Sequence, residues 1–206
     1  MFSVEAHNVV KRFGTKTVLN GITFSHPEGV LGIAGPNGSG KSTLLKCLSG
    51  LLKPTSGSIT WKSLEGELSD RELKSRLGYV APYINLYPEL TILENLNFII
   101  QLRKMQMDRD SLERQLGRLQ LHEIRHQAVG ELSTGQLQRT RLACSLAYRP
   151  SILFLDEPGA NLDEQGANLI RTIVDQSREE SRLVLLASNN REELNLADRV
   201  ISVVND

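Results

Sequence analysis

The sequence predicts an α/β fold with a parallel β-sheet core, an antiparallel β unit at the N-terminus and a helical insertion. Three observations lead to this prediction. Apolar runs alternate with helix-like segments after residue 150, as in chains that build a parallel sheet with crossover helices. β-branched residues are frequent in residues 2–25, which favours a strand pair. Residues 84–149 are largely helical in pattern, so we expect a single domain over residues 1–206 that contains this inserted segment.

Apolar and β-branched stretches bounded by turn residues such as Gly14 and Pro54 predict the strands. In chain order these strands are residues 2–10, 17–25, 30–34, 57–61, 77–81, 152–155, 183–187 and 200–204. Residues 62–75 are polar and charged, and they predict a solvated loop with room for a short helix.

Apolar residues at helical spacing predict the helices. Thr91 and Glu94 form a capping-box pattern at the start of one helix, and Pro150 stops another. The expected helices are one directly after Thr43 and those at residues 92–105, 110–120, 133–148 and 163–178.

Composition and sequence pattern bear on three possibilities: a nucleic-acid surface, a secreted protein and a membrane-spanning protein. Lys plus Arg and Asp plus Glu both number 24, so net charge gives no indication of a nucleic-acid surface. Cys47 and Cys144 lie in apolar helical patterns and are expected to be buried thiols in a reducing, cytosolic compartment. We recognise neither a signal peptide nor an apolar stretch long enough to span a bilayer. We therefore expect a soluble chain that reaches a membrane only through a partner.

A phosphate-binding loop pattern, G-x-x-x-x-G-K-[ST], lies between the strand at residues 30–34 and a helix. Successive backbone N–H groups in such a loop converge on phosphate oxygens, and the helix N-terminus adds partial positive charge. Lys41 is expected to reach the β- and γ-phosphates, and the Ser42 hydroxyl to bind Mg²⁺. The nucleotide-binding residues expected here are Gly35, Pro36, Asn37, Gly38, Ser39, Gly40, Lys41, Ser42 and Thr43. The alternative without a nucleotide site is a glycine-rich turn between a strand and a helix.

The strand at residues 152–155 leads into the carboxylates Asp156 and Glu157. Ligands of open parallel sheets bind at the carboxyl ends of the strands. Asp156 is therefore expected to hold Mg²⁺ with Ser42, directly or through water, and Glu157 to polarise or deprotonate an attacking water. Without a phosphate loop, the same residues would indicate only a strand that ends in solvent.

The segment Leu132-Ser133-Thr134-Gly135-Gln136 has two interpretations. Ser133 and Gln136 form a capping box, and a capped helix start with a nearby glycine is also an anion site. At this point the sequence resembles the ATPase subunit of ATP-binding-cassette (ABC) transporters, whose signature is LSGGQ. The resemblance covers essentially the whole chain and includes the segment Gly159–Asp163, which is similar to the family's D-loop.

The resemblance implies a P-loop NTPase core and a head-to-tail dimer, with a second copy or a homologous subunit. In that dimer Ser133, Gly135 and Gln136 of one chain act on the ATP held by the other, and Asp163 takes the acidic D-loop position. Phe13 stacks on adenine; the alternative for Phe13 is a core aromatic. The implied partner is an integral membrane transporter subunit, contacted by residues about 82–100. The chain is then peripheral on the inner face of the cell membrane.

Two positions depart from the family pattern. The family has a Mg²⁺-contacting Gln after the strand that here reads Gly78-Tyr79-Val80, whereas this chain has Ala81 and Pro82, with Asn85 or a water as substitutes. The family also has a His where this chain has Asn189, and an amide donates a hydrogen bond without taking up a proton near neutral pH. Glu157, Lys41 and Asn189 are the expected catalytic residues, in an ATPase of reduced rate.

Two other functions compete with transport. A soluble ABC-type ATPase acting on nucleic acid or ribosomes would be expected to have two such domains or long coiled-coil insertions. A regulatory module that binds ATP without hydrolysing it is motivated by Pro82 and Asn189. His122 and His126 are spaced to share a metal on a helix, but two exposed histidines are the preferred interpretation. The transported substrate and the direction of transport stay open.

Overall fold

The structure is a computed structural model that describes residues 2–204, with the side chain of Glu164 left out. One of its two sheets is antiparallel, with strand order β2-β1-β4-β5. Its strands are β1 (Phe2–Phe13), β2 (Lys16–His26), β4 (Ser56–Ser63) and β5 (Gly66–Glu67). Val4 pairs with His26 on β2 and with Trp61 on β4, so β1 is the central long strand.

The second sheet is parallel, with strand order β6-β7-β8-β3-β9. Its strands are β3 (Val30–Ala34), β6 (Leu77–Val80), β7 (Ile152–Asp156), β8 (Leu183–Ser188) and β9 (Arg199–Ser202). β6, β7 and β8 are buried along their whole length. This explains their continuous apolar sequences, because a sheet covered on both faces needs apolar side chains on both.

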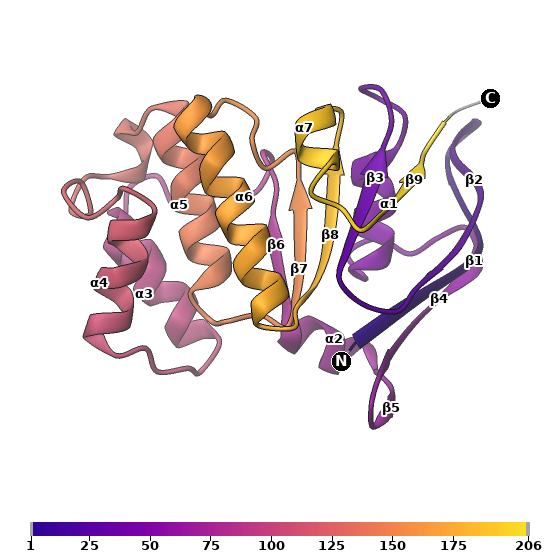
Figure 1. The fold of residues 1–206 in the computed structure, drawn as a ribbon, viewed down its shortest axis with the longest axis horizontal. Coiled ribbons are helices and arrows are strands. Elements are labelled where there is room, and N and C mark those ends of the chain that lie inside the picture. Colours follow the sequence, from indigo (N-terminus) through magenta and orange to yellow (C-terminus); the bar gives the residue numbers. More distant parts are fainter. Residues whose placement is uncertain (1, 205–206) are drawn as a thin grey trace.

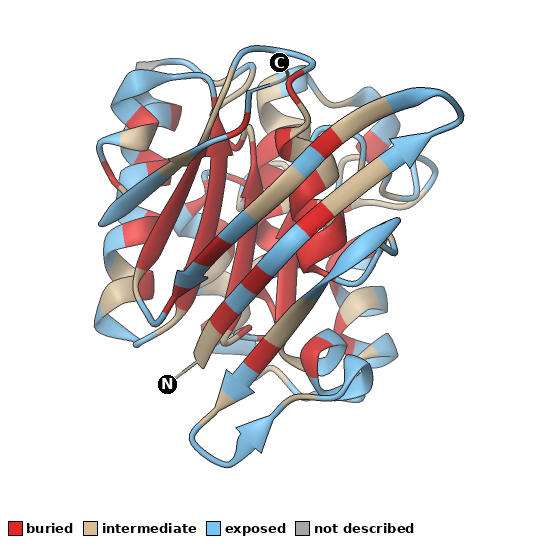
Figure 2. Cartoon of the chain, turned by 90° about the vertical axis from the view of Figure 1, so that its right-hand side faces the viewer, coloured by how far each residue is buried: buried red, intermediate tan, exposed pale blue. Residues whose placement is uncertain are grey.

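The helices cover the parallel sheet on both faces. They are α1 (Lys41–Leu48), α2 (Asp70–Arg76), α3 (Ile92–Leu102), α4 (Arg109–Arg118), α5 (Thr134–Leu146), α6 (Glu164–Glu179) and α7 (Arg191–Leu194), with a 3-10 turn at Val129–Glu131. α3, α4, α5 and α6 gather on one side of the sheet, and the antiparallel strands lie on the other (Figure 1). Seen from that other side, the antiparallel strands cross in front of the buried parallel strands (Figure 2).

Two apolar clusters form the core. One joins the antiparallel strands, α1 and one face of the parallel sheet, and it includes Leu44, Trp61 and Phe154. The other joins the opposite face to the helices on that side, and it includes Leu96, Leu142 and Ile170. Because α1 contributes to the first cluster, the helix that follows the phosphate loop is fixed between the two sheets.

The predicted fold class is confirmed, and several boundaries differ. The helix predicted to end at residue 105 ends at Leu102, because Lys104 adopts a left-handed backbone with φ 53°. The next helix starts at Arg109, where the Asp108 side chain accepts a hydrogen bond from the Ser111 amide at 2.8 Å. The polar stretch 62–75 contains both β5 and α2. Local capping therefore sets boundaries that apolar periodicity does not reveal.

Candidate functional site

The phosphate loop, residues 35–43, joins the end of β3 to α1. Gly40 precedes the helix with φ 108°, and a Cβ at this position would lie 2.9 Å from the carbonyl oxygen of Val18. In the described structure no side chain caps α1. The N–H groups of its first turn are therefore available to a bound anion.

Lys41 is buried at the centre of this loop. Its Nζ donates hydrogen bonds to the carbonyl oxygens of Gly35 at 2.8 Å and Pro36 at 3.2 Å. It also forms an ion pair with Glu157 Oε1 at 3.1 Å. The fold thus brings two of the predicted catalytic residues into direct contact, although they are 116 positions apart in the chain.

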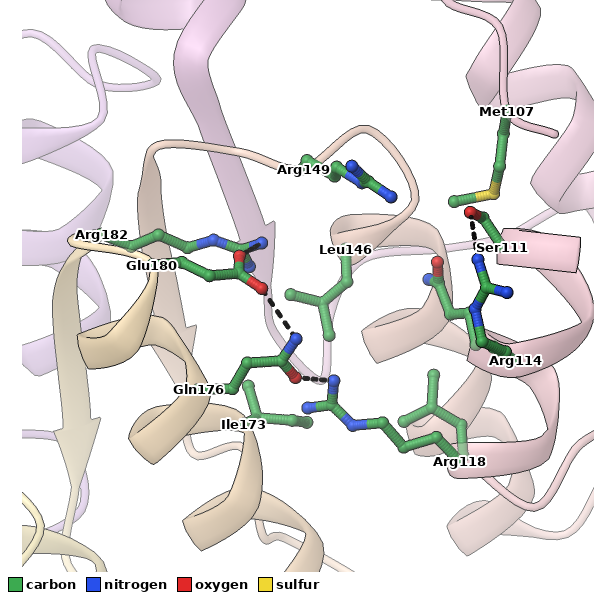
Figure 3. A pocket seen from close by; sticks show the side chains of 12 residues that line it. Met107, Ser111, Arg114, Arg118, Leu146, Arg149, Ile173, Gln176, Glu180 and Arg182 are labelled. Atoms are coloured by element: carbon green, nitrogen blue, oxygen red, sulfur yellow. Dashed lines mark hydrogen bonds and ion pairs between the residues drawn. The ribbon is translucent and has the colours of Figure 1, made fainter.

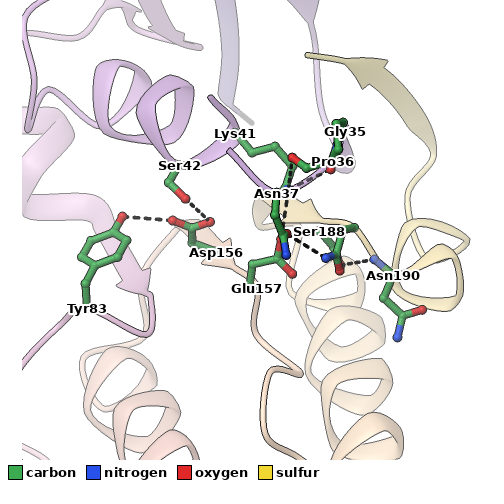
Figure 4. A network of polar contacts seen from close by, with 11 residues as sticks. Gly35, Pro36, Asn37, Lys41, Ser42, Tyr83, Asp156, Glu157, Ser188 and Asn190 are labelled. Carbon is green, nitrogen blue, oxygen red and sulfur yellow. Dashed lines mark hydrogen bonds and ion pairs between the residues drawn. The ribbon is translucent and has the colours of Figure 1, made fainter. Parts of the chain in front are cut away.

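Asp156 ends β7 and is fully buried. Ser42 Oγ donates a hydrogen bond to its Oδ1 at 3.0 Å, and Tyr83 Oη donates one to its Oδ2 at 3.0 Å (Figure 4). Burial raises the pKa of Asp156, while the hydrogen bonds from Ser42 and Tyr83 oppose that rise. Both oxygens of a buried carboxylate are therefore satisfied, as such a group requires.

The sequence places Tyr83 only in the segment 82–100 that is expected to contact the membrane partner, and it does not indicate a role for Tyr83 at the nucleotide or metal site. Its hydroxyl lies 2.7 Å from the hydroxyl of Tyr79 on β6, and the Lys46 Nζ lies 3.8 Å from the centre of its ring. Asn85, the side chain suggested as a substitute for the family's Gln, is exposed. The polar contact from this segment to Asp156 therefore comes from Tyr83.

Glu157 has an unusual backbone. Its φ is +48°, a left-handed value that residues other than glycine seldom adopt. Its amide donates to the carbonyl oxygen of Ala187 at 2.8 Å. Such conformations cluster at functional sites, where the surrounding structure holds them in place. Here the turn directs the Glu157 carboxylate toward Lys41.

Asn189, directly after β8, also reaches the phosphate loop. Its Nδ2 donates a hydrogen bond to Asn37 Oδ1 at 2.8 Å. A side chain that contacts the γ-phosphate must lie next to the phosphate loop. Asn189 meets this condition, because it contacts Asn37 of that loop.

The Ser42 and Asp156 oxygens suit a small hard cation. They lie 3.0 Å apart, close to the spacing of about 3 Å between neighbouring ligands in an octahedron with Mg–O bonds of about 2.1 Å. Among the described side chains, no group of three His, Cys, Asp or Glu could hold a metal ion. A donor set of this kind fits Mg²⁺ that is shared with phosphate oxygens.

Residues 133–136 of the signature segment line a cavity of about 440 Å³. Ser133 and Gln136 cap α5 reciprocally, with N···O distances of 2.9 and 3.2 Å. Asp163 caps α6 by accepting from the Gly166 amide at 2.9 Å. The described lining of this cavity includes residues 133–136 and 161–163 and no residue of the phosphate loop. The predicted site residues thus form two separate groups within one chain.

Two further residues matter for the site: Phe13, which is exposed, and Glu193, which is buried. The Phe13 side chain is 51% exposed, so its alternative interpretation as a core aromatic is wrong. Glu193, on α7, is buried, and burial raises the pKa of its carboxyl group. A methyl group at Gly159 would collide with this carboxylate, so the close approach of Glu193 requires glycine at the start of the D-loop-like segment. No sequence motif indicates Glu193, because its contact depends on the fold.

His122 and His126 have the spacing of a possible metal pair; His126 is exposed and His122 is half-buried. His122 contacts Glu113 Oε2 at 3.0 Å and Glu123 Oε1 at 2.9 Å. Cys47 and Cys144 are both buried free thiols, as predicted. Across the described residues no helix has the length and apolar character needed to cross a membrane.

Comparison with known proteins identifies relatives along the whole chain. Residues 19–160 match the sequence model of the ABC transporter family. The ABC transporter ATP-binding protein YybJ of Bacillus subtilis is 32% identical over 93% of this chain and 87% of its own length. The sulfate/thiosulfate import ATP-binding protein CysA of Synechocystis is 33% identical over 98% of this chain, which spans 58% of that longer relative.

Solved structures give the same result. A bacterial ABC transporter cassette, solved as a dimer, superimposes with a TM-score of 0.83 and 27% identity over 97% of this chain and 94% of the cassette. An ABC transporter ATP-binding protein from Pyrococcus furiosus superimposes with a TM-score of 0.82 over 98% of this chain and 97% of its own. At 24% identity, that second match supports the fold alone.

Proposed function

Because this chain belongs to the ABC transporter family of ATP-hydrolysing subunits, we propose that it drives the movement of a substrate through a separate membrane protein. The observation that carries this proposal is the convergence of Lys41, Asp156 and Glu157 beside the phosphate loop. The whole chain would act as one domain, with residues 84–149 as the inserted helical segment between β6 and β7.

ATP would bind with its phosphates on the phosphate loop and its adenine on the exposed ring of Phe13. The anionic phosphates compete with Glu157 for the Lys41 ammonium group. Lys41 would then exchange its ion pair with Glu157 for a phosphate oxygen. This exchange frees the Glu157 carboxylate at the place where hydrolysis needs a base.

Ser42 and Asp156 would hold Mg²⁺, which neutralises charge on the phosphate oxygens. Tyr83 acts on this group through Asp156, because its hydroxyl fixes the second carboxylate oxygen. In hydrolysis a water attacks the γ-phosphorus, the bond to the ADP oxygen breaks, and Glu157 accepts the proton of the water. Asn189, anchored to Asn37, would donate a hydrogen bond to the γ-phosphate.

The second half of the site would come from another chain. Ser133, Gly135 and Gln136 line a cavity separate from the phosphate loop, and a helix N-terminus with a glycine in its first turn suits an anion. In a head-to-tail dimer this cavity would cover the nucleotide of the partner. ATP binding then closes the dimer, and hydrolysis opens it.

The segment from residue 82 to 100 would contact the membrane partner. Tyr87 and Phe98 are 52% and 39% exposed, and their rings pack edge to face with centroids 5.0 Å apart. Exposed aromatic groups of this kind are common at protein interfaces. Since Tyr83 belongs to the same segment and contacts Asp156, movement of the partner would be transmitted to the metal side of the site. The chain would then be peripheral on the inner face of the membrane.

A regulatory ATPase with weak hydrolysis is the second candidate. It is favoured by Asn189, because the Asn189–Asn37 contact supplies a hydrogen bond but no titratable group. In that case the chain would bind ATP and dimerise with little turnover.

The two candidates are separated by one experiment on the purified chain and its Glu157→Gln variant. With Mg·ATP we expect steady phosphate release that falls at least about a hundredfold in the variant, since the general base is lost. Size-exclusion chromatography with light scattering should detect an ATP-dependent dimer that lasts longer in the variant. Equal rates in the two proteins would remove Glu157 from the catalytic role. Stable ATP-bound dimers of the unmutated chain without phosphate release would favour the regulatory candidate.

A further inference from the structure

A cavity of about 520 Å³ lies between α4, the end of α5 and the C-terminal half of α6. Its described lining shares no residue with the phosphate loop or with the signature cavity. The proposed ATPase site therefore does not account for it. Its volume is in the range of small-molecule sites, about 300 to 1,000 Å³.

Four guanidinium groups line this arginine cavity: those of Arg114, Arg118, Arg149 and Arg182. Figure 3 shows them on different sides of the cavity, with Arg114 and Arg118 coming from α4. Among the described lining residues, Glu180 is the one carboxylate. The chain as a whole has no net charge, so this concentration of positive charge is a local feature.

Several polar contacts hold these side chains in place. Arg118 donates to the Gln176 amide oxygen, and Gln176 Nε2 donates to Glu180 Oε1 at 2.7 Å. Glu180 also forms an ion pair with Arg182. Because α4 and α6 are thereby joined across the cavity, the guanidinium groups of Arg118 and Arg182 are positioned before any ligand arrives, which reduces the entropy lost on binding.

The electrostatics of the cavity favour an added anion. Burial lowers the pKa of Arg118, Glu180 opposes this effect, and nearby Arg182 lowers the pKa further. Burial likewise lowers the pKa of Arg182, with Glu180 raising it and Arg149 lowering it again. In both cases the attraction to Glu180 is larger than the repulsion from the neighbouring arginine, so the net lowering of the pKa comes from burial. An anionic ligand would add negative charge beside these buried guanidinium groups and favour their charged form.

Part of the cavity lining is apolar. Leu119 and Ile173 are buried, while Leu146 and Met107 are partly exposed. Guanidinium forks match phosphate oxygens in a bidentate way, and the apolar lining residues can contact a hydrocarbon or aromatic part of a ligand. Charge and shape together describe a ligand with a multiply charged head and an apolar body.

We propose that the arginine cavity binds a small phosphorylated molecule, held by its phosphate groups between α4 and α6. The phosphate oxygens would be shared by Arg114 and Arg118 on α4, by Arg149 between α5 and β7, and by Arg182 between α6 and β8. A ligand in this position would link the inserted helices to the parallel-sheet core.

The test is a titration of the ¹⁵N-labelled chain with inorganic pyrophosphate, followed by NMR so that two sites are resolved by position. We expect the amides of Ser111, Leu146 and Ile173 to shift together, separately from shifts in the phosphate loop. Phenyl phosphate should bind the cavity more tightly than inorganic phosphate, because only phenyl phosphate has an apolar group that can contact the apolar lining residues.

The double variant Arg114→Gln/Arg149→Gln should weaken pyrophosphate binding at the cavity at least about tenfold, since charge-assisted hydrogen bonds are lost. Shifts in the phosphate loop should stay unchanged in that variant. The double variant Arg71→Gln/Lys74→Gln, at two exposed positions of α2, removes the same number of positive charges outside the cavity and is the matched control. Pyrophosphate shifts confined to the phosphate loop, or cavity shifts that persist in Arg114→Gln/Arg149→Gln, would overturn the proposal. So would sedimentation with phosphatidic-acid vesicles that depends on Arg114 and Arg149 without binding of soluble pyrophosphate.

Discussion

At the scale of single residues, the buried carboxylate of Asp156 on β7 depends on donors from two other parts of the chain. Ser42 lies on α1, and Tyr83 lies three residues after the end of β6. Tyr79 extends this contact into the core, because its ring stacks on Phe154 with centroids 5.5 Å apart. Tyr83 is therefore a positioning residue, which acts on the proposed metal site through the carboxylate.

Tyr83→Phe should raise the Mg²⁺ concentration needed for half-maximal ATP hydrolysis. The change removes a donor to buried Asp156 Oδ2, and an unsatisfied buried acceptor costs about 1–3 kcal/mol, or roughly five- to a hundredfold in binding. The measurement is the ATPase rate against Mg²⁺ concentration at fixed ATP.

Tyr87→Phe is the control for this change. Tyr87 is exposed, and its ring contact with Phe98 does not require the hydroxyl. If Tyr83→Phe and Tyr87→Phe have the same Mg²⁺ dependence as the unmutated chain, the positioning role is excluded. Equal melting temperatures in the three proteins would separate this effect from a general loss of structure.

At the scale of elements, the reliable predictions rest on residues that are neighbours along the chain. The capping boxes at Thr91 with Glu94 and at Ser133 with Gln136 are both confirmed, because each needs only four consecutive residues. A third capping box, Ser69 with Glu72, was missed, since α2 buries only Leu73 and has little apolar periodicity. Tyr83 and Glu193 could not be predicted, because their partners are brought together by the tertiary fold.

Thr91→Ala should lower the free energy of unfolding by about 1 kcal/mol, the usual cost of losing an N-cap. The Thr91 hydroxyl accepts from the Glu94 amide at 3.1 Å, and the Glu94 carboxylate accepts from the Thr91 amide at 2.8 Å. Urea unfolding measures the change. Thr172→Ala is the matched control, because Thr172 is an exposed mid-helix residue bonded only to the carbonyl of its own helix. A loss as large in Thr172→Ala as in Thr91→Ala would contradict the capping argument.

At the scale of the whole molecule, the chain passes from the antiparallel to the parallel sheet between β2 and β3. His26 is buried at this junction. Asp198 and Arg199 pack nearby, where Asp198 Oδ2 accepts from the Val30 amide at 2.7 Å and Arg199 donates to the Ser25 carbonyl oxygen at 2.6 Å. Protonation of His26 therefore places a charge where the two sheets meet.

Stability should fall as the pH drops below about 6.5. Burial lowers the pKa of His26 below its ordinary value of 6.5, and Arg199 adds to this effect, while Gly29, Asp198 and Glu28 oppose it. The unfolded chain then binds the proton more readily than the folded chain, so acid favours unfolding. Urea unfolding at pH 7.5 and 5.5 should show this loss, and His26→Gln should reduce it.

The unmutated chain must be compared with His26→Gln because the titration of Glu193 changes stability with pH in the opposite direction to that of His26. Burial raises the pKa of its carboxyl group, so the folded chain gains stability as the pH falls toward the ordinary value of 4.5. This contribution is present in both proteins and cancels in the difference. An identical loss of stability between pH 7.5 and 5.5 in His26→Gln would assign the acid sensitivity to other groups.

Trp61 is the only tryptophan in the chain, and its position has a spectroscopic consequence. Its indole Nε1 donates to the Leu48 carbonyl oxygen at 2.8 Å, at the end of the helix that begins at Lys41. Its ring centre lies 5.9 Å from that of Phe154, two residues before Asp156. Intrinsic fluorescence at the tryptophan wavelength therefore comes from one buried indole that touches both the helix and the strand of the proposed nucleotide site.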